Sequence, residues 1–176
     1  MKKVLLASFL LFIAFYSCKK EITPIDPTHK TTPVAFPQPS NFPTPNLPLD
    51  NPLTKEGIAL GRHLYYEKRM SIDNTVSCAT CHNQDYNFST PSKSGMGVNG
   101  PTHNSVMIHS NLAWQENLLW NGFATSIEQV AYLTIIDPVE MNSTWEISLG
   151  KIENDPKYIS LYEAAFGPNA ITTENS

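Results

Sequence analysis

The strongest chemical signal in the sequence comes from three neighbouring residues, Cys78, Cys81 and His82. They form a C-x-x-C-H motif, which is the attachment signature of a c-type haem. Two intervening residues on a helical turn match the separation of the porphyrin vinyl groups to which the thiols add. The adjacent histidine is then carried beneath the iron as its proximal ligand. The motif therefore predicts covalently attached haem c, with His82 on the iron.

The same two thiols also fit a redox dithiol or half of a zinc site. A structural zinc site needs two further ligands, and the sequence has no second cysteine pair. A redox dithiol does not need the adjacent histidine. The third cysteine, Cys18, lies in a leader and has a separate explanation.

Residues 1–17 have the pattern of a lipoprotein signal peptide. Lys2 and Lys3 precede an apolar run over residues 4–16, which is too short to span a bilayer. The run ends at Ser17-Cys18, and this pattern resembles bacterial leaders that are cut before a cysteine, which is then lipidated. We therefore expect a lipid anchor on Cys18 and a location in the periplasm or cell envelope. A plain secretory peptide cut elsewhere is the alternative.

Residues 18–50 are predicted to be a proline-rich linker. Nine of the 14 prolines of the chain fall between residues 23 and 52. Proline fixes φ and removes a hydrogen-bond donor, so this stretch is expected to form neither a helix nor a central strand. It is predicted to be an extended spacer that holds the domain away from a membrane.

The composition fits one small domain with these attachments. The chain has 176 residues, of which 41% are hydrophobic and 16% charged, and its formal net charge is −4. Binding to a nucleic acid requires a cluster of lysines and arginines that contacts the backbone phosphates. This acidic chain has no such cluster, so nucleic acid is excluded as a partner. Membrane contact is expected through the lipid anchor only.

Residues 51–176 are predicted to fold as a mainly α domain with short helices and long loops. Thr54 is expected to open one helix, and capping boxes at Thr125/Glu128 and Ser143/Glu146 are expected to open two more. The Asp155-Pro156 pair predicts a fourth helix that Gly167 ends. Residues 83–111 are predicted to form a long irregular loop, and a large buried cofactor explains why a domain this small contains one.

The segment from Asn51 to about Thr172 resembles the bacterial dihaem cytochrome c peroxidases and their relatives of the MauG type. The similar stretches are 51–54, 59–66, 69–71, 76–82, 111–114, 120–122 and 137–141. The resemblance implies a cytochrome c-like fold and the N-terminal haem domain of two. A second C-x-x-C-H motif follows in the family, whereas this chain stops at Ser176, so a fragment of a dihaem protein is one expectation.

The resemblance also implies roles for individual residues. Glu140 matches the family's distal glutamate, which is proposed to move a proton between the peroxide oxygens. Trp120 matches the tryptophan between the two haems, a conduit for electrons. Where the family has a distal-pocket glutamine this chain has Val130, with Gln129 one place earlier.

Two further positions concern metal ions. Gly95-Met96-Gly97 occupies the place of the family's Gly-His-Gly turn, so Met96 is a candidate distal ligand of the iron. His103 and His109 are weaker candidates for that role. Asn104 resembles an asparagine that binds calcium at the domain interface of the family.

The function implied by the resemblance is reduction of H2O2 to water. The electrons would come from a periplasmic donor such as a small cytochrome, and in the family a second haem domain relays them. A monohaem electron carrier without peroxidase activity is the alternative from a different class of protein. A third hypothesis follows the MauG branch, in which a partner protein is oxidised.

Overall fold

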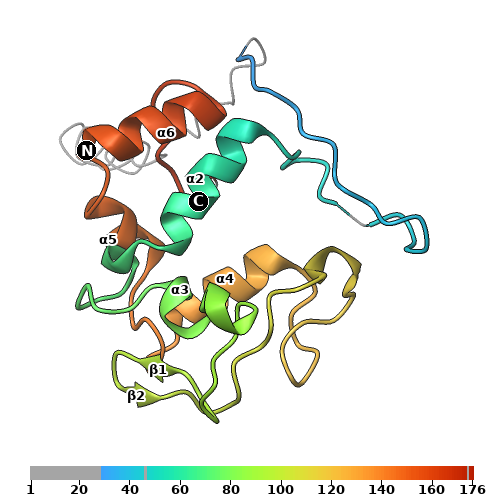
Figure 1. Ribbon diagram of the computed structural model, residues 1–176. Helices are drawn as coiled ribbons and strands as arrows, with labels where there is room; N and C mark the ends of the chain where they lie inside the picture. The colour runs from blue at the N-terminus through green and yellow to red at the C-terminus, as the bar shows by residue number, and fades with distance from the viewer. Residues whose placement is uncertain (1–28, 46, 174) are drawn as a thin grey trace, which may run out of the picture.

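The computed structural model describes residues 29–45, 47–173 and 175–176; the predicted leader and Cys18 lie outside them. In chain order the helices are α2 (Lys55–Tyr65), α3 (Cys78–Cys81), α4 (Ile127–Ile136), α5 (Trp145–Gly150) and α6 (Pro156–Phe166). Short 3-10 turns are η1 (Lys68–Met70), η2 (Gln84–Tyr86) and η3 (Leu112–Trp114), and β1 (Met96–Gly97) pairs antiparallel with β2 (Gly100–Pro101). The predicted mainly α fold with short helices and long loops is confirmed (Figure 1).

The hydrophobic core lies where α2 packs against α6, with α5 beside them. Tyr158 and Tyr162 of α6 are completely buried, as is Ile152. Met70 and Met141 extend the same cluster toward α4. Cys78 of the C-x-x-C-H segment packs against this core, whereas the residues that follow the segment lie in loops.

The ends of α2 and α6 agree with the capping signals in the sequence. The hydroxyl of Thr54 accepts a hydrogen bond from the Gly57 N–H at 3.0 Å. Asp155 caps α6 by accepting from the Lys157 N–H at 3.0 Å, and Pro156 takes the first helical position. Both caps satisfy backbone donors that have no partner within the helix.

Helix α4 begins one residue later than predicted. Its N-cap is Ser126, whose hydroxyl accepts from the Gln129 N–H at 3.1 Å. The Gln129 side-chain oxygen in turn accepts from the Thr125 N–H at 2.9 Å. The predicted Thr125/Glu128 box is therefore wrong by one position, because adjacent Thr and Ser offer the same hydroxyl. The helix ends at Ile136, before Asp137-Pro138, as predicted.

Helix α5 also starts one residue later than predicted and is shorter. Thr144 caps it by accepting from the Ile147 N–H at 3.2 Å, and the helix ends at Gly150. Ser143, the predicted cap, is buried and lies 2.9 Å from the Ser148 hydroxyl, which donates to the Met70 carbonyl. Because the Ser143 hydroxyl is hydrogen-bonded to Ser148 in the core, Thr144 caps the helix instead.

The described part of the proline-rich segment contains neither a helix nor a sheet strand, as predicted. It nevertheless contacts the domain. The Val34 N–H donates to the Leu53 carbonyl, and the Lys55 N–H donates to the Thr32 carbonyl, both at 2.9 Å. The Trp114 indole donates to the Pro43 carbonyl at 2.7 Å. The spacer role and the boundary at residue 50 stay predictions, with the addition that residues 32–43 lie against the domain.

Residues 83–111 form the long loop that the sequence predicts, interrupted by η2 and the two short strands. The loop carries left-handed backbone at Asn87, Phe88 and Asn111. Within the described residues, no helix has the length and apolar character needed to cross a bilayer.

Candidate haem-binding site

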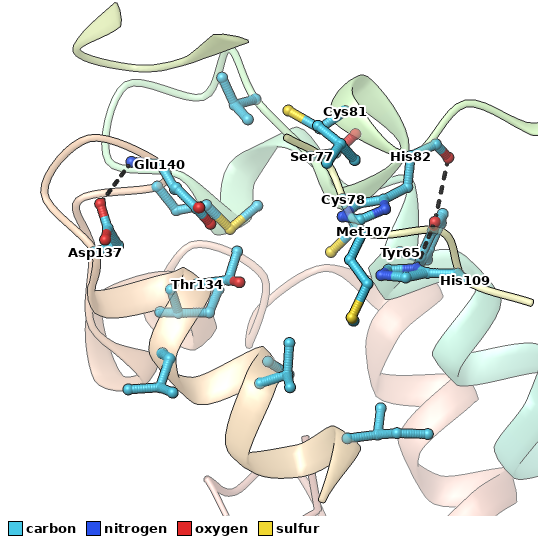
Figure 2. A pocket seen from close by; sticks show the side chains of 18 of the residues that line it. Tyr65, Ser77, Cys78, Cys81, His82, Met107, His109, Thr134, Asp137 and Glu140 are labelled. Carbon is cyan, nitrogen blue, oxygen red and sulfur yellow. Dashed lines mark hydrogen bonds between the residues drawn. The ribbon is translucent and has the colours of Figure 1, made fainter. Parts of the chain in front are cut away.

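The C-x-x-C-H segment lies at the start of the long loop, on the wall of a large cavity. Helix α3 is a single turn, in which a capping box links Ser77 and Thr80. Cys78 and Cys81 are both free thiols at its two ends. One turn of helix thus brings the two sulfurs and His82 to the same wall (Figure 2).

Hydrogen bonding fixes the tautomer of His82. Its Nδ1 lies 3.1 Å from the Phe88 carbonyl oxygen. A carbonyl only accepts, so Nδ1 carries the hydrogen and Nε2 keeps the lone pair that a metal requires. Burial lowers the pKa of His82, and the neighbouring Phe88 and Met107 carbonyls partly oppose this change. The neutral imidazole is the form that binds iron.

The two cysteines are thiols rather than thiolates at neutral pH. Burial raises the pKa of Cys78 to about 11, and burial also raises the pKa of Cys81. Gly95 lies so close to Cys81 that a Cβ there would come within 2.8 Å of its sulfur. The loop therefore closes tightly over the second attachment point.

His109 stacks on His82, with ring centroids 3.6 Å apart and an interplanar angle of 17°. The Tyr65 hydroxyl contacts both residues: it donates to the His82 carbonyl at 3.2 Å and lies 3.1 Å from His109 Nδ1. Burial, followed by the neighbouring His82, lowers the pKa of His109 to about 4, so its ring is neutral at pH 7. His109 therefore lies against His82 rather than facing it across the cavity.

Glu140 also lines the cavity, on the α4 side and away from His82 in Figure 2. Burial, and then the negative charge of Asp137, raises the pKa of Glu140. A hydrogen bond with Thr134 and the charge of His103 oppose that change. A carboxyl group with a raised pKa inside a cavity is suited to exchange protons with a bound molecule.

The remaining predicted positions are placed differently. Met96 is 60% exposed and does not line the cavity, whereas Met107, which the sequence analysis did not single out, does. Trp120 lies at the rim, 72% exposed, and donates from its indole to the Ser105 carbonyl at 2.8 Å. Val130 lines the cavity, and Gln129 is occupied in the cap of α4.

Asn104, the candidate calcium ligand, is exposed and also lines the cavity. The described residues contain no group of three or more His, Cys, Asp or Glu side chains that could hold a metal ion. Calcium binding at Asn104 stays a prediction.

The cavity fits a haem. Its volume is about 1170 Å³, beyond the range of about 300–1,000 Å³ that small-molecule and cofactor sites usually span. Side chains from α2, α4 and the long loop line it, and they are mostly apolar, including Leu64, Val106 and Ala131. Cys78, Cys81 and His82 all line it. The residues present therefore suit a flat apolar macrocycle held at one wall.

The fold and the site define a mainly helical domain of the c-type haem class. A family model described as di-haem cytochrome c peroxidase matches residues 55–176, and the chain belongs to this family. The family implies haem c as the cofactor.

Two curated relatives and one solved structure show the range of the family. The methylamine utilization protein MauG of Methylorubrum extorquens is 36% identical over 135 residues, which are 75% of this chain and 37% of that protein. The cytochrome c peroxidase Ccp of Escherichia coli K12 is 29% identical over 144 residues, 77% of this chain and 30% of that protein. A MauG-like protein associated with microbial copper homeostasis superposes with a TM-score of 0.75 at 26% identity, covering 81% of this chain and 43% of that one. The chain thus spans less than half the length of each of these relatives.

Proposed function

We propose that this chain is the peroxide-reactive haem domain of a cytochrome c peroxidase. The reaction is H2O2 + 2 electrons + 2 protons giving two molecules of water. The observation that carries the proposal is the placement of the Glu140 carboxyl group in the same cavity as the C-x-x-C-H motif, on another wall. An electron carrier has no use for a proton-exchanging group at that place, whereas O–O cleavage needs one.

Glu140 supplies the proton transfers in this proposal. As a carboxylate it removes the proton from one peroxide oxygen, and as a carboxylic acid it returns a proton to the oxygen that leaves as water. Cys78, Cys81 and His82 would hold haem c, which would supply the iron for peroxide binding and electron transfer. Because the pKa of Glu140 is raised, its basic form develops at a higher pH than that of an ordinary carboxyl group.

We propose that the electrons enter at the rim that carries Trp120. Trp120 is 72% exposed, and Phe123, three residues further along the chain, is 62% exposed. Exposed aromatic side chains beside a cofactor cavity suit contact with a protein partner. A small periplasmic cytochrome or a second haem domain is the partner that this function requires.

Oxidation of a partner protein, as a second candidate, is favoured by the 36% identity to a MauG protein. The same exposed Trp120 would then carry electrons from the partner into the cavity. The two functions share the peroxide step and differ in the electron source, which is a reduced cytochrome in one and a protein side chain in the other.

The test uses protein matured with the bacterial cytochrome c assembly system. We expect a covalent haem spectrum whose oxidised form is high-spin and shifts on addition of H2O2. We expect Glu140→Gln to slow that shift about 100-fold or more, since general acid–base groups contribute about 10²–10⁴-fold. Glu128→Gln changes an exposed carboxylate of α4 and is the matched control. A low-spin spectrum indifferent to peroxide would support an electron carrier instead.

We propose in addition that the protein is lipid-anchored in the cell envelope through Cys18. The basic and apolar leader that ends at Ser17-Cys18 supports this location. Mass spectrometry of the mature N-terminus is the test: a diacylglyceryl group on Cys18 is expected, and an unmodified terminus elsewhere would contradict the anchor. Cys18→Ser is expected to release the protein from the membrane fraction.

A further inference from the structure

The loop from Gly95 to Thr102 forms a small hairpin, built on β1 and β2, beside two parts of the site. The Thr102 N–H donates to the Gly95 carbonyl, and the Gly95 N–H donates to the Thr102 hydroxyl, both at 3.0 Å. These bonds close the base of the hairpin. Its backbone then has a defined shape, although its tip at Asn99 is exposed.

One side of the hairpin lies directly on the backbone that carries Glu140. A Cβ at Gly97 would overlap the carbonyl oxygen of Val139 and would lie 2.7 Å from the Cα of Glu140. Both neighbours are backbone atoms, which cannot rotate away as a side chain can. Only glycine therefore permits this approach.

Hydrogen bonds hold the two segments together at this contact. The Val98 N–H donates to the Glu140 carbonyl at 2.9 Å, and the Asn99 N–H donates to the Val139 carbonyl at 3.2 Å. The Asn99 side chain adds a bond to the Pro138 carbonyl at 2.7 Å. Three consecutive carbonyls, those of residues 138–140, are thus bound by the hairpin.

The backbone N–H groups of the same segment are also hydrogen-bonded. Asp137 accepts hydrogen bonds from the Val139 and Glu140 N–H groups at 2.7 and 3.1 Å. The next residue, Met141, is buried in the core, and its carbonyl accepts from the Ile72 N–H. Asp137 thus binds the N–H groups of this segment, the hairpin binds its carbonyls, and Met141 anchors its end in the core.

The other side of the hairpin contacts a haem-attachment residue. Gly95 packs against the side chain of Cys81, and the Met96 carbonyl oxygen lies 3.6 Å from the Cys81 sulfur. The hairpin is therefore in contact with both an attachment cysteine and the Glu140 backbone. We propose that it is a positioning element, with Gly97 as its key residue, that sets the place of the Glu140 carboxyl group relative to the haem attached at Cys81.

This role rests on the proposed function of Glu140, and it makes a distinct claim. Glu140 would be correctly placed only while Gly97 lets the hairpin lie flat on the Val139–Glu140 backbone. A displacement of about 1 Å at a catalytic group lowers rates about 100-fold. Gly97→Ala keeps the carboxyl group, the thiols and the iron ligand, and changes only this contact.

The test compares two ligands of the haem-loaded protein. Cyanide enters as HCN and must lose a proton, so its association with the oxidised protein depends on a well-placed base. Carbon monoxide binds the reduced protein without proton transfer and has a similar size. We expect Gly97→Ala to slow cyanide association about 100-fold, approaching the effect of Glu140→Gln, and to leave carbon monoxide association within about twofold.

Two further variants make the result decisive. Gly150→Ala is the matched control, because no atom lies within 4 Å of a Cβ at that position. Asn99→Ala removes only the bond to the Pro138 carbonyl from an exposed residue, so it tests the contact if Gly97→Ala does not fold. It is expected to slow cyanide association several-fold, again without an effect on carbon monoxide.

The outcomes separate this inference from the proposed function. Unchanged cyanide association in Gly97→Ala and Asn99→Ala, while Glu140→Gln slows it, would overturn the positioning role and leave the function standing. Equal slowing of both ligands would also overturn it, since a general disturbance of the cavity would then explain the data. Slowed cyanide association in a protein that does not turn over H2O2 would support the positioning role and refute the peroxidase.

Discussion

Glu67 gives the sharpest prediction about stability, because its carboxylate is held by several donors. Arg69 donates to it from its guanidinium at 3.0 and 2.9 Å, and the Tyr158 hydroxyl donates at 2.7 Å. Hydrogen bonds from Arg69 lower the pKa of Glu67 from its ordinary value of 4.5 to about 2, and burial opposes this effect. The group joins η1 to α6, so its charge supports the packing of the core.

The size of the effect follows from the two pKa values. The difference between 4.5 and about 2, at about 1.4 kcal/mol for each pKa unit, sets an upper bound of about 3.5 kcal/mol. Solvent screens part of this, because the Arg69 side chain is 34% exposed. We therefore expect Glu67→Gln to lower the free energy of unfolding by about 1–2 kcal/mol at pH 7.

The sign of the pH dependence is fixed by the lowered pKa. The folded form binds the proton less readily than the unfolded form, so the stability from this group is fully present above pH 4.5 and is lost as pH falls toward 2. Urea unfolding of wild type and Glu67→Gln, both haem-loaded, is the assay between pH 7 and pH 2.5. Glu163→Gln, an exposed carboxylate of α6, is the control. A deficit that is independent of pH, or no deficit at pH 7, would refute this reasoning.

Two more predictions concern the surroundings of the site. Gly95→Ala places a Cβ 2.8 Å from the Cys81 sulfur. We therefore expect a fall in the fraction of protein with haem bound through Cys81, measured by mass spectrometry of haem peptides. Unchanged attachment would show that the loop moves to accommodate the methyl group. Trp114→Ala removes two edge-to-face ring contacts, worth about 0.5–1.5 kcal/mol each, and the hydrogen bond to Pro43. We expect faster protease cleavage within residues 32–43, and equal cleavage rates would mean that the segment is held elsewhere.

Local signals in the sequence predicted the helices well, because a cap depends on residues two or three positions apart. Thr54 and Asp155 were assigned correctly for this reason. The errors at α4 and α5 have the same origin, because two adjacent hydroxyl residues satisfy the rule equally in each case. At α5 the choice depends on burial of Ser143, which no local pattern reveals.

In the candidate site, too, the residues of a local motif could be predicted, and those placed by tertiary structure could not. The attachment motif is contiguous, so Cys78, Cys81 and His82 could be named from sequence and are found together on one wall. Met96 and Met107 both lie in the irregular loop, where no periodicity tells which side chain turns inward. The sequence favoured Met96 by resemblance, while the structure brings Met107 to the cavity.

Position 97 shows why resemblance to a family identifies reactive groups more readily than the groups that place them. Glu140 was proposed from its motif, since a carboxyl group has chemistry of its own. Gly97 has no side chain, and its importance comes from the atoms that approach it, the Val139 carbonyl and the Glu140 Cα, more than forty residues further along the chain. Such a contact has no signature in a single sequence. If the hairpin does position Glu140, the identity of residue 97 matters as much to the proton transfer as the carboxyl group itself, and substitution at either position should produce the same kinetic defect.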